Sequence, residues 1–204
     1  MTRLAMFPLG TVLFPCAALP LQVFEPRYQA MLRDCLAGDR QFGVVLIERG
    51  SEVGGDDDRF GVGTVAAIAD TAELPDGRWL LLVTGGRRLR VDEWLPDDPY
   101  PRAEISQLGD PVWHDADAAL LRSAETEVRR ALAYASELGE PVGPATFELA
   151  DTPVVAVWQL AAVAPLGPVD KQRLLEVVGH RERLVTLTDL ARDQAELLAY
   201  RLSG

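Results

Sequence analysis

Apolar residues in the first half of the chain come in short runs, separated by glycine, proline and charged residues. This pattern is typical of β-strands bounded by turns. It predicts strands at residues 4–7, 18–23, 42–48, 59–69, 78–84, 87–94 and 102–108. Gly85-Gly86 is predicted to turn a hairpin between two of these strands, and the glycine-rich, acidic segment 50–59 is predicted to be an exposed loop. Short strands at this spacing indicate a small barrel or a pair of packed sheets.

One helix is predicted among these strands. Pro26 suits the first turn of a helix, and Gly38 is a stop signal. Between them, apolar residues recur at helical spacing: Tyr28, Met31, Leu32 and Cys35.

The second half of the chain has the longer period of amphipathic helices. Helices are predicted at residues 116–138, 154–164, 169–178 and 182–202, and the second of these is apolar almost all round. We therefore expect an α+β protein with two parts, a β-rich part at residues 1–110 and a helical part at 111–204.

Composition and charge exclude several classes of protein. The chain has 204 residues, 48% of them hydrophobic, a formal net charge of −11 and a pI near 4.6. This acidity disfavours binding to nucleic acid or to an anionic membrane. No apolar run reaches the ~20 residues of a membrane helix. Cys16 and Cys35 have no zinc-site spacing. We expect a cytoplasmic protein with reduced thiols.

The chain also lacks the common catalytic patterns. Lys171 is the only lysine, and Gln172 follows it where a phosphate-binding loop needs Ser or Thr. We interpret Lys171 as a solvent-facing helix residue. The two histidines, His114 and His180, have no partner at metal-ligand spacing. No nucleophile has an evident base, so we expect no catalysis, no cofactor and no metal site.

Three arginines, Arg87, Arg88 and Arg90, form a small basic cluster. In an acidic chain they are expected to pair with internal acids such as Asp92, rather than with a polyanion. Strand alternation places Arg88 and Arg90 on one face.

An ordered series of motifs runs along the chain. It includes Phe7-Pro-Leu-Gly-Thr-Val-Leu-Phe-Pro15, Leu19-Pro-Leu-Gln-Val-Phe-Glu-Pro-Arg-Tyr28, Gly61-Val-Gly-Thr-Val65 and Gly86-Arg-Arg-Leu-Arg-Val91, and it continues through Asp170-Lys-Gln172. This series resembles the N-terminal substrate-binding domain of Lon proteases, and the likeness spans residues 2–202. Leu89 stands where the family usually has Phe. The resemblance implies a PUA-like β pseudo-barrel with one early helix, followed by a C-terminal helical bundle.

The resemblance also implies a function. In Lon this region helps to capture unfolded or tagged polypeptides and aids hexamer assembly. Because the chain ends at Gly204, we expect a stand-alone binding module without ATPase or protease domain, with a separate ATPase or protease as a possible partner. The expected binding surface consists of exposed apolar groups and their charged neighbours: Phe14, Pro15, Leu19, Phe24, Glu25, Arg27 and Tyr28.

Alternatives stay open at this stage. Phe24 and Tyr28, one helical turn apart, could instead staple the helix to the barrel. Glu25 and Arg27 could form an ion pair or a helix cap. A second hypothesis is a regulatory domain that binds a small ligand between barrel and helices. A third is a peptidase that acts without ATP, against which the residues themselves argue.

Overall fold

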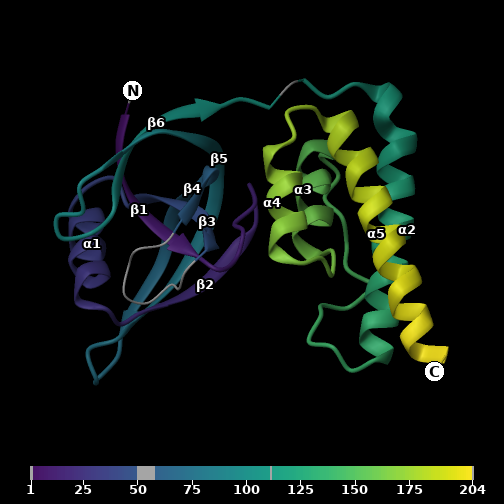
Figure 1. Ribbon diagram of the computed structural model, residues 1–204, viewed down its shortest axis with the longest axis horizontal. Coiled ribbons are helices and arrows are strands. Elements are labelled where there is room, and N and C mark those ends of the chain that lie inside the picture. The colour runs from purple at the N-terminus through teal and green to yellow at the C-terminus, as the bar shows by residue number, and fades with distance from the viewer. Residues whose placement is uncertain (1, 50–57, 111, 204) are drawn as a thin grey trace. The chain divides into compact units, whose positions relative to one another are not determined.

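The computed structural model describes residues 2–49, 58–110 and 112–203 (Figure 1). The chain forms two compact units, Met1–Gly109 and Asp110–Gly204. Most of the acidic loop expected at 50–59 lies outside the described residues. Among the described residues, no helix is long and apolar enough to cross a membrane.

The first unit is a β-barrel with one helix. Its strands are β1 (Thr2–Leu9), β2 (Ala18–Val23), β3 (Gln41–Arg49), β4 (Asp58–Glu73), β5 (Trp79–Leu95) and β6 (Arg102–Leu108). They form one sheet in the order β2-β5-β4-β3-β1-β6, and β5 also pairs with β6. This extra pairing closes every strand except β2 into a ring. The β1–β3 pair is parallel, and the other pairs are antiparallel.

The hairpin predicted around Gly85-Gly86 is wrong, because β5 runs straight through both glycines. Gly85 is instead a point of close backbone approach. A Cβ atom there would lie 2.0 Å from the carbonyl oxygen of Phe14. Gly85 makes two backbone hydrogen bonds to this segment, each of 2.8 Å. Its carbonyl accepts from the Cys16 amide, and its amide donates to the Ala17 carbonyl. Glycine thus lets residues 14–17 cross the strand at a distance that a side chain would forbid.

Helix α1 (Pro26–Ala37) covers part of the barrel and buries the stripe that its sequence predicts: Tyr28, Met31, Leu32 and Cys35. The ring of Tyr28 lies 4.3 Å from that of Phe7, centroid to centroid, and the Phe7 ring is 5.9 Å from that of Phe42. These rings join the helix to β1 and β3 in the barrel core. Leu89 belongs to a second apolar cluster with Met6 and is fully buried.

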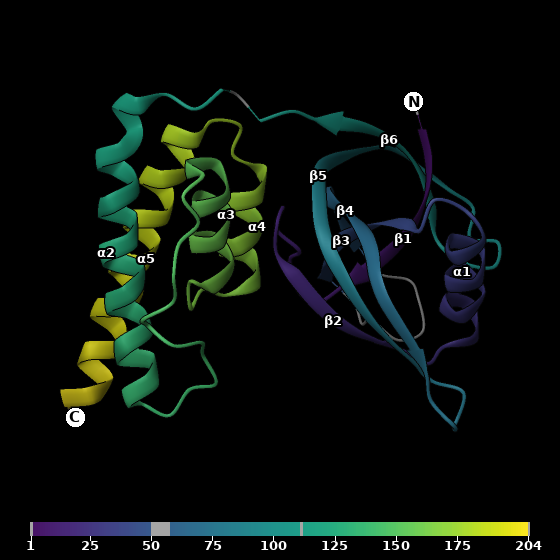
Figure 2. The ribbon, with the colours of Figure 1, turned by 180° about the vertical axis from the view of Figure 1, so that it is seen from behind.

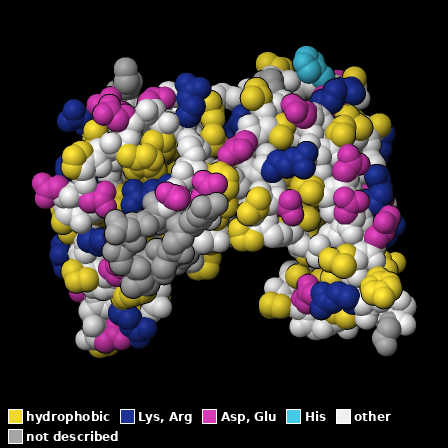
Figure 3. Space-filling model, viewed as in Figure 1, with side chains coloured by type: hydrophobic (Ala, Val, Ile, Leu, Met, Phe, Trp, Pro, Cys, Tyr) yellow, Lys and Arg dark blue, Asp and Glu magenta, His cyan; other side chains and the backbone are white. Residues whose placement is uncertain are grey.

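The basic cluster on β5 is split by the fold. Arg90 is exposed and lies 3.4 Å from Asp92, as expected. Arg88, predicted to share its face, is only 2% exposed, and its guanidinium donates to the Gly109 carbonyl at 3.3 Å. Elsewhere, basic and acidic side chains are interspersed over the described residues of the face seen in Figure 3.

The second unit is helical. A short 3₁₀ turn at Asp115–Asp117 leads into α2 (Ala118–Glu137), followed by α3 (Pro153–Val163), α4 (Pro168–Glu176) and α5 (His180–Ser203). Helices α2 and α5 lie side by side in both views (Figures 1 and 2). Helix α3 buries residues all round its surface, including Val157, Trp158 and Leu160, as its even hydrophobicity predicts.

Arg183 joins two turns of this unit from a fully buried position. Its guanidinium lies 3.9 Å from the centroid of the Trp158 ring and donates to the carbonyls of Leu174 and Val177. These carbonyls belong to the C-terminal end of α4, where no amide of the helix can reach them. A buried arginine thus takes the place of a helix cap.

Candidate functional site

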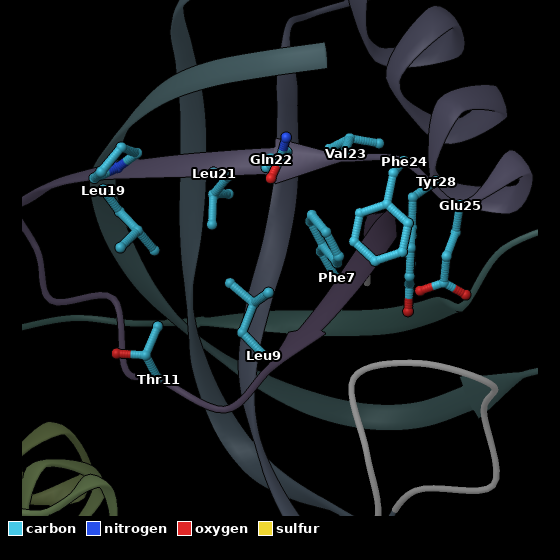
Figure 4. A pocket seen from close by; sticks show the side chains of 11 residues that line it. Phe7, Leu9, Thr11, Leu19, Leu21, Gln22, Val23, Phe24, Glu25 and Tyr28 are labelled. Atoms are coloured by element: carbon cyan, nitrogen blue, oxygen red, sulfur yellow. The ribbon is translucent and has the colours of Figure 1, made fainter. Parts of the chain in front are cut away.

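The clearest candidate site in the barrel unit is a groove of about 330 Å³ between β1, β2 and the start of α1 (Figure 4). Its lining is mostly apolar and consists of Phe7, Leu9, Thr11, Leu19, Pro20, Leu21, Gln22, Val23, Phe24, Glu25 and Tyr28. We refer to it as the β1–β2 groove.

Strand β2 forms one wall because its side chains alternate. Leu19, Leu21 and Val23 are partly or fully buried, whereas Pro20 and Gln22 are exposed. Leu19 and Leu21 point toward Leu9 of β1, across the groove (Figure 4). Because side chains alternate along a strand, every second residue of β2 faces the groove, and these residues are all apolar.

The outer edge of β2 has no neighbouring strand among the described residues, since β2 pairs only with β5. Pro20 stands opposite Leu82 of β5 and has no N–H to donate. The backbone hydrogen bonds from β2 to β5 are therefore made by Leu19 and Leu21, while the backbone groups of Pro20 and Gln22 face away from β5. The edge offers carbonyl acceptors at both positions and an amide donor at Gln22. Proline at this place weakens the edge for pairing with arbitrary strands.

An aromatic residue stands at the end of the groove. Phe24 lines the groove and is 50% exposed. Tyr28 lies below, only 3% exposed and packed on Phe7. The Arg27 guanidinium is 4.5 Å from the centroid of the Tyr28 ring and 3.1 Å from the carboxylate of Glu25. Glu25 occupies the N-cap position of α1 but makes no side-chain cap hydrogen bond. Of the two roles considered for this pair, the ion pair is the one formed.

The fold divides the residues expected at the binding surface. Leu19, Phe24, Glu25 and Tyr28 line the groove, and Arg27 lies beside it on Tyr28. The expectation that Phe14, Pro15 and Tyr28 are exposed is wrong, because all three are buried. Tyr28 packs on Phe7 and so joins the helix to the barrel, which was the alternative considered for it. The segment of Phe14 and Pro15 crosses β5 at Gly85, so the proline-bounded run is packed against the barrel.

Sequence reasoning missed several lining residues. The alternation of β2 could have indicated Leu21 and Val23, because they share the face of Leu19. Phe7 and Leu9 could not be found in that way, since nothing local places β1 opposite β2.

Groups that could carry other chemistry lie elsewhere. His114 is exposed, whereas His180 is 2% exposed with its ring centroid 6.0 Å from that of Trp113. Within the described part of the chain, no three potential ligand residues are grouped to hold a metal ion. Lys171, expected to face solvent, is half-buried, and its ammonium donates to the Ala162 carbonyl at 2.9 Å.

Comparison with known sequences gives one consistent match. A family described as the ATP-dependent protease La (LON) substrate-binding domain matches residues 3–193. Lon protease 2 of Herpetosiphon aurantiacus is 29% identical over 201 residues, which is 96% of this chain and 24% of that protein. Lon protease of Cytophaga hutchinsonii is 30% identical over 191 residues, 92% of this chain and 23% of that protein. The chain thus spans about a quarter of the length of these curated relatives.

Solved structures agree with this match. A Lon N-terminal domain protein from Xanthomonas campestris has a TM-score of 0.66 at 27% identity, over 93% of this chain and 98% of that one. The N-terminal domain of Mycobacterium avium complex Lon protease has a TM-score of 0.68 at 19% identity, covering 94% and 99%. The second likeness concerns the fold alone. Together they confirm the α+β fold expected from the motif series.

Proposed function

The chain belongs to the family of Lon substrate-binding domains, and on this premise we propose that it binds polypeptides in the β1–β2 groove. The bound segment is extended and comes from an unfolded or tagged chain. Its apolar side chains enter the groove, and its backbone runs along the outer edge of β2.

One observation carries this proposal: half-exposed Phe24 stands at the end of an apolar groove, beside an edge of β2 that pairs with no strand in the described part of the chain. In an extended peptide, every second side chain points the same way, at a spacing of about 6.6 Å. Such side chains can enter between Leu9 and Leu21 while the peptide backbone meets the Pro20 and Gln22 carbonyls. This mode of recognition adds a strand to an exposed edge and leaves side-chain pockets to select residues.

The magnitude expected from Phe24 follows from its exposure. A phenylalanine side chain buries about 150–250 Å² in full. Covering the exposed half, 50%, therefore removes about 100 Å² of apolar surface from water, worth about 2.5 kcal/mol. That corresponds to a change of roughly 30- to 100-fold in Kd.

We further propose that binding occurs without chemistry on the client. Among the described residues, Glu25 and Tyr28 are the only ionisable ones that line the groove, and Glu25 forms an ion pair with Arg27. We place the module in cytoplasmic protein quality control, with a partner ATPase or protease that processes the captured chain. The alternative of a small-ligand pocket between barrel and helices stays a prediction.

The proposal is tested by fluorescence anisotropy with a labelled, permanently unfolded model protein and with a short leucine-rich peptide. Phe24→Ala should weaken binding of both by at least about tenfold. Leu80→Ala is the matched control, because Leu80 is 43% exposed on β5 but does not line the groove. Unchanged affinity of Phe24→Ala, or an equal loss in Leu80→Ala, would refute groove binding. Incubation of the client with the protein should also yield no cleavage products by mass spectrometry.

A further inference from the structure

The helical unit contains a larger cavity, of about 550 Å³, formed without any residue of the barrel. Its walls come from the loop after α2, the end of α3 with the loop that follows, and the start of α4. They are apolar over most of their area, with Val142, Val163, Pro165 and Leu166 among the lining residues. We call it the Lys171 cavity, after the only lysine of the chain.

Lys171 brings a positive charge into this apolar setting. Its ammonium donates one hydrogen bond, to the Ala162 carbonyl in the last turn of α3, at 2.9 Å. An ammonium has three donors. Among the described residues, the structure gives Lys171 no carboxylate partner. Burial lowers the pKa of its amino group from the usual 10.5, because desolvation penalises the charged form. The charge thus carries a desolvation cost that no acid in the described chain offsets.

Among the described residues that line the cavity, the one acidic side chain already has a partner. The carboxylate of Glu140 lies 2.6 Å from the guanidinium of Arg201 in α5. The cavity therefore presents a single uncompensated cation among aliphatic walls. A complementary ligand has one negative charge and a compact apolar body. A phosphate suits this cavity less well, because its charge and its acceptors call for several cationic donors.

We propose that the Lys171 cavity binds a carboxylate that carries an aliphatic body, with the Lys171 ammonium as its counter-ion. The carboxylate accepts hydrogen bonds from the N–H groups of the Lys171 ammonium that do not donate to the Ala162 carbonyl. The aliphatic body lies against Val142, Val163 and Leu166. Two sources share this chemistry: a free aliphatic acid, and the C-terminal α-carboxylate of a polypeptide that ends in aliphatic residues. The proposal is independent of the β1–β2 groove, because the two sites have no residue in common.

A structural role for Lys171 is the competing explanation, since a cation near the end of a helix stabilises its last carbonyls. The two explanations predict different effects of a substitution at Gly143, because only ligand binding depends on the space beside it. A Cβ added to Gly143 would meet no heavy atom within 4 Å, and its backbone is not left-handed. Because Gly143 lines the cavity, Gly143→Leu adds an aliphatic side chain to the cavity wall, and it does not alter Lys171 or Ala162.

The test measures binding of two probes by calorimetry and by NMR titration of the intact protein. The first probe is hexanoate, with hexanamide as its neutral match. The second is a pentapeptide that ends in Leu-Ala, with a free or an amidated C-terminus. The free carboxylates should bind at least about tenfold more tightly than the amides, as expected for a charge-assisted hydrogen bond.

The variants locate the site. Lys171→Met and Gly143→Leu should each weaken carboxylate binding about tenfold or more, whereas Lys171→Arg should retain it. Gly143→Leu should melt at the wild-type temperature, which keeps the test valid if Lys171→Met unfolds. Preference for hexanoate or for the peptide identifies the source. Equal binding of acid and amide, no binding of either acid, or wild-type binding by Gly143→Leu would overturn the proposal.

Discussion

The crossing of residues 14–17 over β5 makes a sharp prediction for Gly85→Ala. A Cβ atom at this position would lie 2.0 Å from the Phe14 carbonyl oxygen and 2.8 Å from its carbonyl carbon. Both are backbone atoms, so no side-chain rotation can relieve the contact. The crossing segment must move away, and the two hydrogen bonds of Gly85, to Cys16 and Ala17, must lengthen.

The expected loss is large for one methyl group. Each of the two hydrogen bonds contributes about 1 kcal/mol net. Forcing extra volume into a packed site costs about 1–3 kcal/mol more. The free energy of unfolding of the barrel unit should therefore fall by about 3–5 kcal/mol, a sizeable part of the about 5–15 kcal/mol that stabilises a typical domain.

Neighbouring glycines supply matched controls. At Gly86, the nearest atom to an added Cβ is the Val65 carbonyl oxygen at 3.1 Å, and at Gly61 no heavy atom lies within 4 Å. Gly86→Ala should cost less than about 1 kcal/mol, and Gly61→Ala should be neutral or slightly stabilising. If Gly85-Gly86 turned a hairpin, substitution at Gly86 would cost as much as at Gly85.

Urea denaturation followed by circular dichroism and tryptophan fluorescence measures these differences. The two probes should be compared, because two compact units need not unfold in one step. A Gly85→Ala variant within about 1 kcal/mol of wild type, or an equal loss in Gly86→Ala, would refute the close approach.

Three further outcomes are expected. Burial, aided by nearby acids, raises the pKa of the Cys35 thiol from 9.0 to about 11, so the stability that this thiol contributes is complete below pH 9 and disappears as the pH rises to 11. Over that range wild type should lose about 1–2 kcal/mol more than Cys35→Ala in urea titrations, and parallel pH profiles would contradict this. Tyr100→Phe removes the 2.7 Å hydrogen bond to the carboxylate of Asp34 on α1 and should lower the free energy of unfolding by about 1.5 kcal/mol in the same assay. An unchanged free energy of unfolding would mean that this contact does not hold α1 in place. Arg183→Met removes the buried guanidinium that donates to the Leu174 and Val177 carbonyls and should cost about 3–5 kcal/mol. Arg192→Met, in an exposed ion pair, should cost less than about 1 kcal/mol. Similar losses in both variants would contradict the capping role.

Local patterns were reliable where one element's own residues decide the outcome. The helix expected between Pro26 and Gly38 is present at Pro26–Ala37, because a proline start, an apolar stripe and a glycine stop all act within the helix. The strand at Ala18–Val23 is found at the predicted residues, since alternation is likewise a local property.

Local patterns misled where a distant segment decides the outcome. Gly85 resembled a turn because glycine is common in turns, yet it serves a crossing by residues that lie about seventy positions earlier in the chain. Lys171 resembled a solvent-facing residue because its helix is short and polar, yet the end of α3 and the loop after α2 enclose it.

By itself, the sequence determined the α+β class, the family and most of the elements, because the hydrophobic period and the ordered motifs are properties of the chain itself; the split of β5 into two strands was the exception. Only the tertiary structure decided which apolar residues remain exposed. Phe14 is buried and Phe24 is half exposed, although both are aromatic residues in proline-bounded runs. The physical reason is that exposure depends on what packs against a side chain, and that partner is set by strand pairing and chain crossing over long sequence separations.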